Sequence, residues 1–235
     1  MYSAAAGAGF PPEGTPPAAV FVDLDGTLIS RSSEKLFLQH LIRDGLVSPA
    51  GFIRFLAGYL LHPARTVLEG KGWNRGYLRG LPSAEVATRA EVFAGERLSG
   101  LLRPWTVQAV RGLADRGWHV VLMSASLEPL VSSIACGKAF QGVVASMPEE
   151  EEGTFTGRLA GLRPWGADKA ELARRYCADR GFDPACCLAI CDSWSDRHLM
   201  MLCGRGVAVC PDRKLGRLAA DRGWDIIEGR HAAWA

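Results

Sequence analysis

Residues 18–27 read AAVFVDLDGT, a β-branched apolar run that stops abruptly at Asp25 and Gly26. Such a run is typical of a buried parallel strand, here Ala18 to Leu24, that ends in a turn. Asp23 and Asp25 occupy alternate positions at its carboxyl end, so their side chains point the same way unless the backbone turns between them. Two such carboxylates repel each other unless a cation or a shared proton offsets their charge. Open α/β sheets bind ligands at this end of their strands, which makes the DLDGT segment the first candidate for a site.

Similar short apolar runs recur along the rest of the chain. The next is WHVVLM, residues 118–123, which stops at Ser124, and further runs cover residues 142–145, 187–191, 206–210 and 224–227. Helical patterns separate most of these runs, at residues 104–116, 127–136, 167–179, 196–203 and 212–222. Strands that alternate with helices of this length predict βαβ units and a Rossmann-like parallel sheet covered on both faces, an α/β fold.

One stretch, residues 31–102, breaks the alternation. It shows helical periodicity without a convincing strand, and its four candidate helices are EKLFLQHLI, FIRFLAGYLL, ARTVLEGKGWNRGYL and AEVATRAEVFAGERL. We therefore expect a helical cap domain at 31–102, inserted after the first strand of a catalytic core formed by 18–30 and 103–235. Four cap residues in and directly after the third segment, Trp73, Arg75, Tyr77 and Arg79, are candidates for lining a pocket, although Trp73 and Tyr77 suit helix packing better.

Composition excludes several other classes of protein. The chain has 235 residues, a formal net charge of +2, 48% hydrophobic and 22% charged residues, which is ordinary globular composition. Its arginines are spread along predicted helices and form no basic block, so we expect no nucleic-acid partner. The apolar segment from Phe52 to Leu61 is about half the length of a membrane span, so none is expected.

Two further features bear on where the protein works. Residues 1–17 are rich in proline and lack lysine and arginine, which indicates a disordered tail and no secretory signal. The seven cysteines form no C-x-x-C pair and several lie in apolar runs, which favours reduced core thiols. Both observations predict a cytoplasmic protein.

Other reactive side chains follow the later predicted strands. Ser124 ends the second strand in LMSAS, Lys169 begins a helix in GADKAEL, and Asp192 and Asp196 follow the fourth strand in CDSWSD. Taken singly, each has a structural explanation as a helix cap or a surface charge. Together they place a hydroxyl, a cation and carboxylates at one edge of the sheet, where a lysine near a helix start favours an anion.

The set DLDGT, the SAS serine, the GADK lysine and DSWSD resembles the four motifs of the haloacid dehalogenase superfamily. The helical insert after the first motif resembles its type I cap, and the likeness is nearest to the branch of phosphoserine phosphatases. The resemblance covers roughly Val20 to Glu228. It implies a Mg²⁺-dependent phosphatase that acts on a small-molecule phosphate ester.

The resemblance also implies a role for each matching residue. Asp23 would be the nucleophile that becomes an aspartyl-phosphate, and Asp25 the general acid and base. Asp23, the backbone carbonyl of Asp25 and Asp192 would bind Mg²⁺, whose preferred ligands are hard oxygens. The residues expected to hold the substrate or its phosphate are Ser124, Ala125, Lys169, Gly26 and Ser32, and those expected to support the site are Asp196 and Ser193.

The chain departs from the family pattern in three of its segments. Cys191 replaces the glycine before the fourth-motif aspartate, and the second motif reads Ser-Ala-Ser in place of Ser-Gly-Gly. Ser32 occupies the position of a glutamate that binds the amino group of phosphoserine, with Glu34 two residues further on. We therefore expect phosphate esters without a nearby amine to be preferred. The alternatives are a true phosphoserine phosphatase, a phosphotransferase, and a binding protein that kept the fold without turnover.

Overall fold

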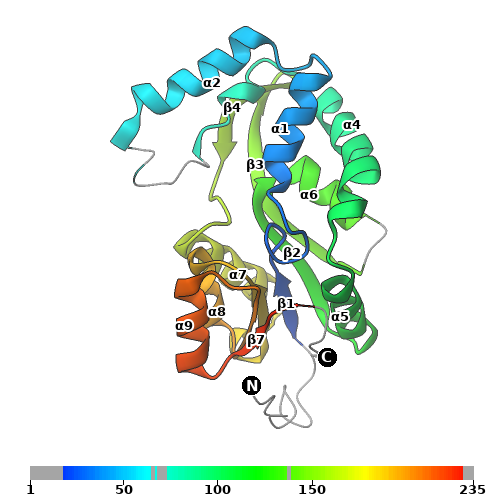
Figure 1. The fold of residues 1–235 in the computed structure, drawn as a ribbon, viewed down its shortest axis with the longest axis vertical. Helices are drawn as coiled ribbons and strands as arrows, with labels where there is room; N and C mark the ends of the chain where they lie inside the picture. The colour runs from blue at the N-terminus through cyan, green and yellow to red at the C-terminus, as the bar shows by residue number, and fades with distance from the viewer. Residues whose placement is uncertain (1–17, 65–66, 68–72, 137–138, 230–235) are drawn as a thin grey trace.

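The structure is a computed structural model that describes residues 18–64, 67, 73–136 and 139–229 (Figure 1). The expected tail at 1–17 lies outside the described residues. A single seven-stranded sheet has the order β4-β3-β2-β1-β5-β6-β7, and all neighbouring strands are parallel except β3 and β4. The strands are β1 (Ala19–Val22), β2 (His119–Leu127), β3 (Gly142–Glu151), β4 (Thr154–Ala160), β5 (Leu188–Cys191), β6 (Arg205–Val209) and β7 (Asp225–Ile227). The predicted α/β fold with a parallel sheet is confirmed.

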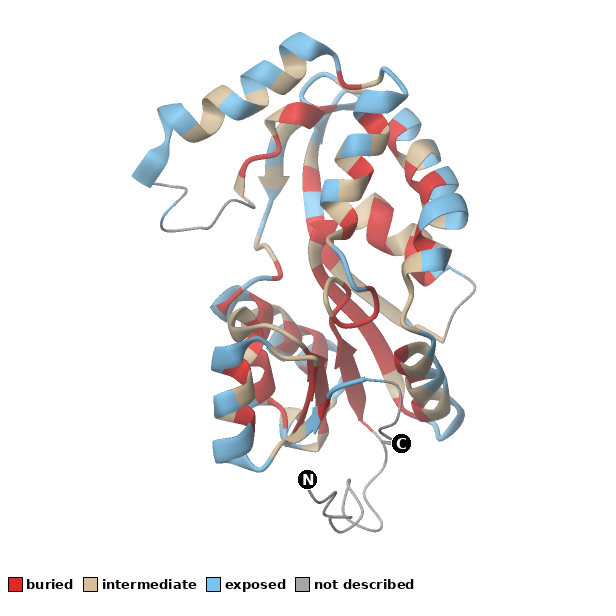
Figure 2. Cartoon of the chain, viewed as in Figure 1, coloured by how far each residue is buried: buried red, intermediate tan, exposed pale blue. Residues whose placement is uncertain are grey.

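Alternate residues of the strands face two separate apolar cores. In β1, Val20 and Val22 join one core, whereas Ala19 and Phe21 join the other. This split follows from the two-residue period of a strand. It explains why the central strands are continuously apolar and fully buried, as Figure 2 shows.

Helices cover both faces of the sheet, near the positions that the sequence predicts. They are α5 (Pro104–Asp115), α6 (Glu128–Ala135), α7 (Ala167–Arg180), α8 (Arg197–Leu202) and α9 (Arg213–Arg222). Residues of α5 and α6 belong to the first core, and residues of α7, α8 and α9 to the second. Two short 3₁₀ helices, η5 (Pro184–Cys186) and η6 (Trp194–Asp196), flank β5. The sheet is therefore held rigidly on both sides, with the carboxyl ends of its strands facing the insert.

The regular elements that the structure describes in the insert at 31–102 are all helical, and short turns and isolated bridges connect them. Its elements are α1 (Ser33–Arg43), α2 (Pro49–Leu61), the 3₁₀ helix η2 (Gly76–Leu78), α4 (Ser83–Phe93), the π-helical turn η3 (Ala94–Leu98) and the 3₁₀ turn η4 (Ser99–Leu101). These helices lie beyond the carboxyl ends of the parallel strands (Figure 1). Across the described ranges, no helix combines the length and apolar character needed to cross a membrane.

The prediction of a third cap helix at residues 64–78 is wrong at its carboxyl end, and residues 65–66 and 68–72 of it lie outside the described residues. Between Trp73 and Leu78 the chain forms only the 3₁₀ helix η2. Asn74 explains the break, because its side chain accepts from Gly76 N at 2.9 Å and donates to the Phe55 carbonyl at 2.8 Å. These side-chain bonds compete with the helical ladder.

The hairpin of β3 and β4 was not predicted beyond residue 145. Its turn residues, Glu152 and Gly153, both have positive φ angles, 49° and 76°, as a tight two-residue hairpin requires. The tip of the hairpin bonds to the insert: Phe155 N donates to the Leu81 carbonyl at 2.9 Å, and Gly80 N donates to the Phe155 carbonyl at 2.8 Å. The hairpin thus connects the sheet with the helices of the insert.

Candidate active site

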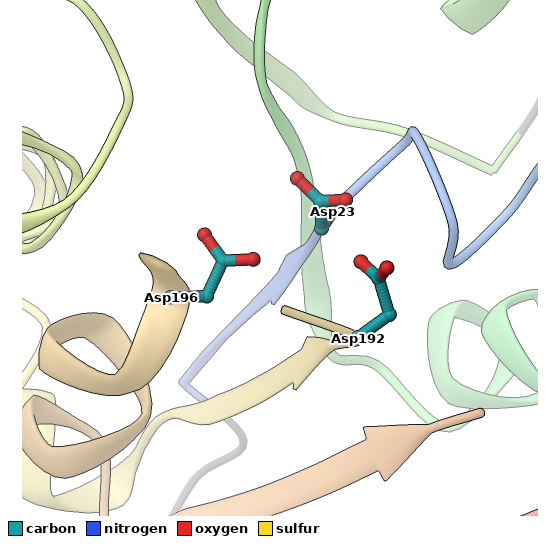
Figure 3. A group of neighbouring side chains, drawn as sticks. All are labelled: Asp23, Asp192 and Asp196. Carbon is teal, nitrogen blue, oxygen red and sulfur yellow. The ribbon is translucent and has the colours of Figure 1, made fainter. Parts of the chain in front are cut away.

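Three carboxylates from two neighbouring strands meet at the carboxyl edge of the sheet. Asp23 directly follows β1, Asp192 directly follows β5, and Asp196 ends η6, one turn further along. One oxygen from each lies within 4.8 Å of the others (Figure 3). Asp23 and Asp196 are only 7% and 3% exposed, so the cluster is shielded from water.

Lys169 supplies the cation at the centre of this cluster. It stands in the first turn of α7, is 1% exposed, and donates from Nζ to Asp23 Oδ1 at 2.5 Å and to Asp196 Oδ1 at 2.8 Å. Burial lowers the pKa of Lys169, but the adjacent carboxylates of Asp196 and Asp23 outweigh that effect and raise it well above its usual value. Lys169 is therefore a fixed cation beside Asp23.

One cation does not balance the clustered acids. Burial raises the pKa of Asp23, Lys169 opposes the rise, and the charges of Asp196 and Asp192 add to it, so this pKa stands well above normal. Burial, with Asp196 next in size, likewise raises the pKa of Asp192 to about 6. The ionised cluster consequently favours an additional positive charge.

Gly26 shapes the space next to Asp192. Its φ of +92° suits glycine, and a Cβ at this position would lie 1.9 Å from Asp192 Oδ2. The N–H of Gly26 donates to the Ile29 carbonyl and is therefore not available to a ligand; the distance is 2.7 Å. Gly26 contributes to the site through the space that its missing side chain leaves beside Asp192. Thr27, which the sequence reasoning missed, donates from Oγ1 to Asp192 Oδ1 at 3.2 Å and orients that carboxylate.

These residues fit a Mg²⁺ ion. The nearby donors are carboxylate oxygens, the pKa values of Asp23 and Asp192 are raised by burial and mutual repulsion, and the missing side chain of Gly26 leaves space beside Asp192. Asp23 and Asp196 each accept from Lys169 through Oδ1, whereas Asp192 Oδ1 accepts from Thr27. All three carboxylates belong to the acidic group that could hold a metal ion.

Asp25 is held by serine groups from two different elements. Ser33 N, at the start of α1, donates to Asp25 Oδ1 at 2.9 Å, and the Ser126 hydroxyl in β2 donates to Oδ2 at 3.3 Å. The hydroxyls of Ser33 and Ser126 are 2.8 Å apart. Burial raises the pKa of Asp25, while hydrogen bonds from Ser33, Ser32 and Ser126 limit the rise. Ser32 thus lies beside Asp25, and Ser33 and Ser126 are contacts that the sequence reasoning missed.

Ser124 and Ala125 lie in β2, directly before Ser126. Ser124 is 2% exposed, and its Oγ accepts from Ser126 N at 3.2 Å. The carbonyl of Ala125 accepts from Ser146 Oγ at 2.7 Å and from Arg75 at 3.2 Å. The second motif therefore has its backbone tied to β3 and to the insert.

Asp212, which the sequence predicted only as the first residue of a helix, holds the loop after β5 in place. Asp212, the N-cap of α9, accepts from Trp194 N at 2.6 Å, and its own N–H donates to the Asp192 carbonyl at 2.8 Å. Ser193 caps η6 by accepting from Ser195 N at 3.3 Å. Both bonds hold the loop that carries Asp192 and Asp196.

Glu34 and Arg75 form an ion pair on the insert side of Asp25. Arg75 is 3% exposed and donates to Glu34 Oε2 at 2.7 Å, while the Tyr77 hydroxyl donates to Oε1 at 2.8 Å. Burial raises the pKa of Glu34, and Arg75 opposes that rise. Of the four candidates for lining a pocket, Arg75 and Tyr77 are buried in this cluster, Trp73 contacts the rings of Tyr59 and His62, and Arg79 is exposed.

Comparison with known proteins adds independent evidence. A family model described as haloacid dehalogenase-like hydrolase matches residues 20–201. Phosphoserine phosphatase SerB1 of Mycobacterium tuberculosis is 30% identical over 92% of this chain and 72% of that one. The inhibition of morphological differentiation protein of Streptomyces azureus is 31% identical, over 91% and 79%. A solved structure of a protein of unknown function from Bordetella pertussis Tohama I is 25% identical, has a TM-score of 0.78 and covers 91% of this chain and 99% of that one.

Proposed function

Because the chain belongs to the haloacid dehalogenase-like hydrolases and is a phosphatase of that family, we propose that it is a Mg²⁺-dependent phosphomonoesterase with Asp23 as its nucleophile. The observation that carries the proposal is the position of Asp23. This carboxylate is buried at the end of β1, bound to the Lys169 cation at 2.5 Å and next to Asp192. A nucleophile needs such a setting, because a carboxylate approaches a phosphate dianion only when positive charge offsets the repulsion.

The first half of the proposed reaction transfers the phosphoryl group to the enzyme. The free oxygen of Asp23 attacks phosphorus, and the bond from phosphorus to the substrate oxygen breaks. Asp25, protonated at that moment, gives its proton to the departing oxygen, so an alcohol leaves and an aspartyl-phosphate remains on Asp23. The raised pKa of Asp25 supports the acid role, because burial favours its protonated form.

The second half regenerates the enzyme. Asp25, now ionised, accepts a proton from a water molecule while that water attacks phosphorus, and the acyl-phosphate bond breaks. Inorganic phosphate leaves, Asp23 recovers its carboxylate, and Asp25 holds a proton for the next cycle. The serine contacts from α1 and β2 keep Asp25 on the side where both proton transfers take place.

Lys169, Ser124 and the metal share the task of holding the phosphate. Asp23, the Asp25 carbonyl and Asp192 would bind Mg²⁺, which when bound neutralises charge on the phosphoryl oxygens. Lys169 stays protonated and balances the charge around Asp23. Asp196 keeps Lys169 in place through its 2.8 Å bond. Ser193 and Asp212 support this arrangement through the loop.

The proposed substrate is a small phosphorylated metabolite without an amine next to its phosphate. Ser32 offers a hydroxyl near Asp25 but no negative charge, and the nearest acid of the insert, Glu34, is bound to Arg75 and Tyr77. A desolvated ammonium requires an anionic partner, because an unpaired buried charge costs several kcal/mol. Introducing Ser32→Glu is therefore expected to raise kcat/KM for phosphoserine relative to an amine-free ester such as glycerol 3-phosphate.

The proposal is tested by turnover of p-nitrophenyl phosphate and a panel of phosphorylated metabolites, with Mg²⁺ or with EDTA. Asp23→Asn keeps the shape of the side chain but removes the nucleophile, so turnover should fall by several orders of magnitude. Asp179→Asn, an exposed change on α7, is the matched control and should keep wild-type activity. A tenth of the wild-type rate in Asp23→Asn, or full activity in EDTA, would contradict the mechanism. A second alcohol in the assay distinguishes hydrolysis from phosphoryl transfer.

A further inference from the structure

A cavity lies within the insert, apart from the acidic cluster. It measures about 350 Å³ and is formed between α1, the end of α4 and the turns η3 and η4. From α1 it takes Leu36, Gln39, His40 and Arg43, whose spacing of three, one and three residues defines one face of a helix. Its volume falls in the usual range for small-molecule sites.

Three guanidinium groups surround this cavity. Arg31 precedes α1, Arg43 ends it, and Arg97 lies on η3, four residues after Phe93. All three are exposed, and in the described part of the chain none of them has a carboxylate within ion-pair distance. No acidic residue lines the cavity. A concave surface lined by charges of one sign concentrates the potential and attracts counter-ions.

The floor of the cavity is aromatic and contains a buried polar atom. His40 and Phe93 pack with ring centroids 5.2 Å apart, and the His40 side chain is 10% exposed. His40 Nε2 makes no hydrogen bond to the described residues, although Asp44 Oδ2 lies 3.5 Å away. Asp44 itself accepts from Arg89 at 3.0 Å. His40 is therefore part of the buried floor, and the polar groups that a ligand can reach are those of the exposed arginines and Gln39.

The position of the cavity connects it to the junction between the insert and the sheet. The two chain segments that cross this junction run side by side, with a bridge between Ile29 and Leu102 and a 2.7 Å bond from Arg103 N to the Leu28 carbonyl. Arg31 and Leu101, both lining the cavity, belong to these two segments. A ligand bound here would contact both connections as well as α1.

We propose that this cavity is a binding site for a small polyanion, a metabolite that carries two or more phosphate or carboxylate groups. Arginine is the residue that recognises such groups best, because its planar fork donates two hydrogen bonds to paired oxygens. Three guanidinium groups around one concavity match a ligand with several anionic groups, and the half-buried Leu36 and Leu101 provide an apolar surface for its carbon skeleton. This site is separate from the phosphatase site and does not depend on its chemistry.

The experiment uses isothermal titration calorimetry of the full chain in chelated, metal-free buffer. Without a metal, the active site presents Asp23, Asp25, Asp192 and Asp196 against Lys169 alone, and this excess of carboxylates repels polyanions. Methylenediphosphonate and citrate serve as the two probes, the first of phosphate type and the second of carboxylate type. The proposal expects one site for at least one probe, and its affinity should fall as salt concentration rises.

Variants assign the site. Arg43→Gln and Arg97→Gln should each weaken binding roughly tenfold, the lower end of what a charge-assisted hydrogen bond contributes. Arg217→Gln, an exposed arginine on α9 without an ion pair among the described residues, is the matched control and should bind like wild type. The proposal would be overturned if Arg43→Gln, Arg97→Gln and Arg217→Gln all bound the probe with the same affinity. It would also be overturned if neither probe bound the wild-type protein at millimolar concentration. Circular dichroism of each variant verifies that a loss of binding is not a loss of fold.

Discussion

Replacing Asp192 by asparagine should make the metal-free protein more stable at neutral pH. Burial and the neighbouring Asp196 raise the pKa of Asp192 to about 6, from an ordinary value of 3.8. The folded state therefore binds a proton more tightly than the unfolded state. Stability from this group is fully present below about pH 4 and is lost as the pH rises through 6. Asparagine keeps the shape and can still accept the bond from Thr27, but it carries no charge.

The magnitude follows from the size of the shift. A difference of about 2 pH units, at 1.36 kcal/mol per unit, corresponds to about 3 kcal/mol at pH 7.5. For a chain of this length, that free energy corresponds to a rise in Tm of roughly 6–12 °C. The assay is thermal unfolding in EDTA, at pH 4 and at pH 7.5. The advantage of Asp192→Asn over wild type should be near zero at the lower pH and reach its full size at the higher one.

Mg²⁺ should reverse the order of stability of wild type and Asp192→Asn. A bound cation favours the ionised carboxylate, so Mg²⁺ at 1,000 times its Kd should stabilise wild type by about 4 kcal/mol, more than the advantage of about 3 kcal/mol that the variant has in EDTA. Asp192→Asn lacks that ligand and should gain little. The exposed change Asp179→Asn controls for loss of one negative charge and should show no pH-dependent difference. An Asp192→Asn protein no more stable than wild type at pH 7.5 in EDTA would refute the reasoning.

Three further predictions concern the same site. Lys169→Met should destabilise the protein by about 3–5 kcal/mol in urea unfolding, because the carboxylates of Asp23 and Asp196 lose their buried cation; an unchanged midpoint would contradict this. Gly26→Ala should weaken Mg²⁺ binding at least tenfold by calorimetry, because the new Cβ would collide with Asp192, whereas Gly45→Ala, where nothing lies within 4 Å, should not. Ca²⁺ should not replace Mg²⁺ in turnover assays, since its longer bonds and additional ligands would misplace Asp23; equal rates with both ions would contradict this.

The parallel part of the sheet can be predicted from the sequence because a strand that is buried on both faces is a short, continuous apolar run. Residues 19–22 and 188–191 are apolar at every position, since both faces of the sheet are covered, and each run ends where the sheet ends. The same rule located Asp23 and Asp192, because strand ends of a parallel sheet share one edge. That Asp23 and Asp192 lie close together can therefore be predicted without knowing any side-chain contact.

The hairpin of β3 and β4 lacks that signature. Its outer strand has a single buried residue, Gly157 interrupts it with a positive φ, and the turn at Glu152 and Gly153 lacks the asparagine that usually marks such hairpins. The strand is stabilised by bonds to the insert that no local pattern encodes. Similarly, the end of the third predicted helix is decided by Asn74, whose side chain reaches back nineteen residues to Phe55.

The contacts of Asp25 and Glu34 could not be predicted from the spacing of residues in the sequence. The resemblance of the first motif to the family implies a glutamate where this chain has Ser32, and the sequence alone leaves Glu34 as a replacement for it. In the structure, Glu34 accepts from Arg75 and Tyr77, two residues more than forty positions away. A substrate ammonium would have to displace Arg75 from this carboxylate and leave a guanidinium that is 3% exposed without its partner. Because removing one member of a buried ion pair costs several kcal/mol, the pair itself opposes an amine in the site, which is why the proposed substrate class depends on Arg75 as much as on Ser32.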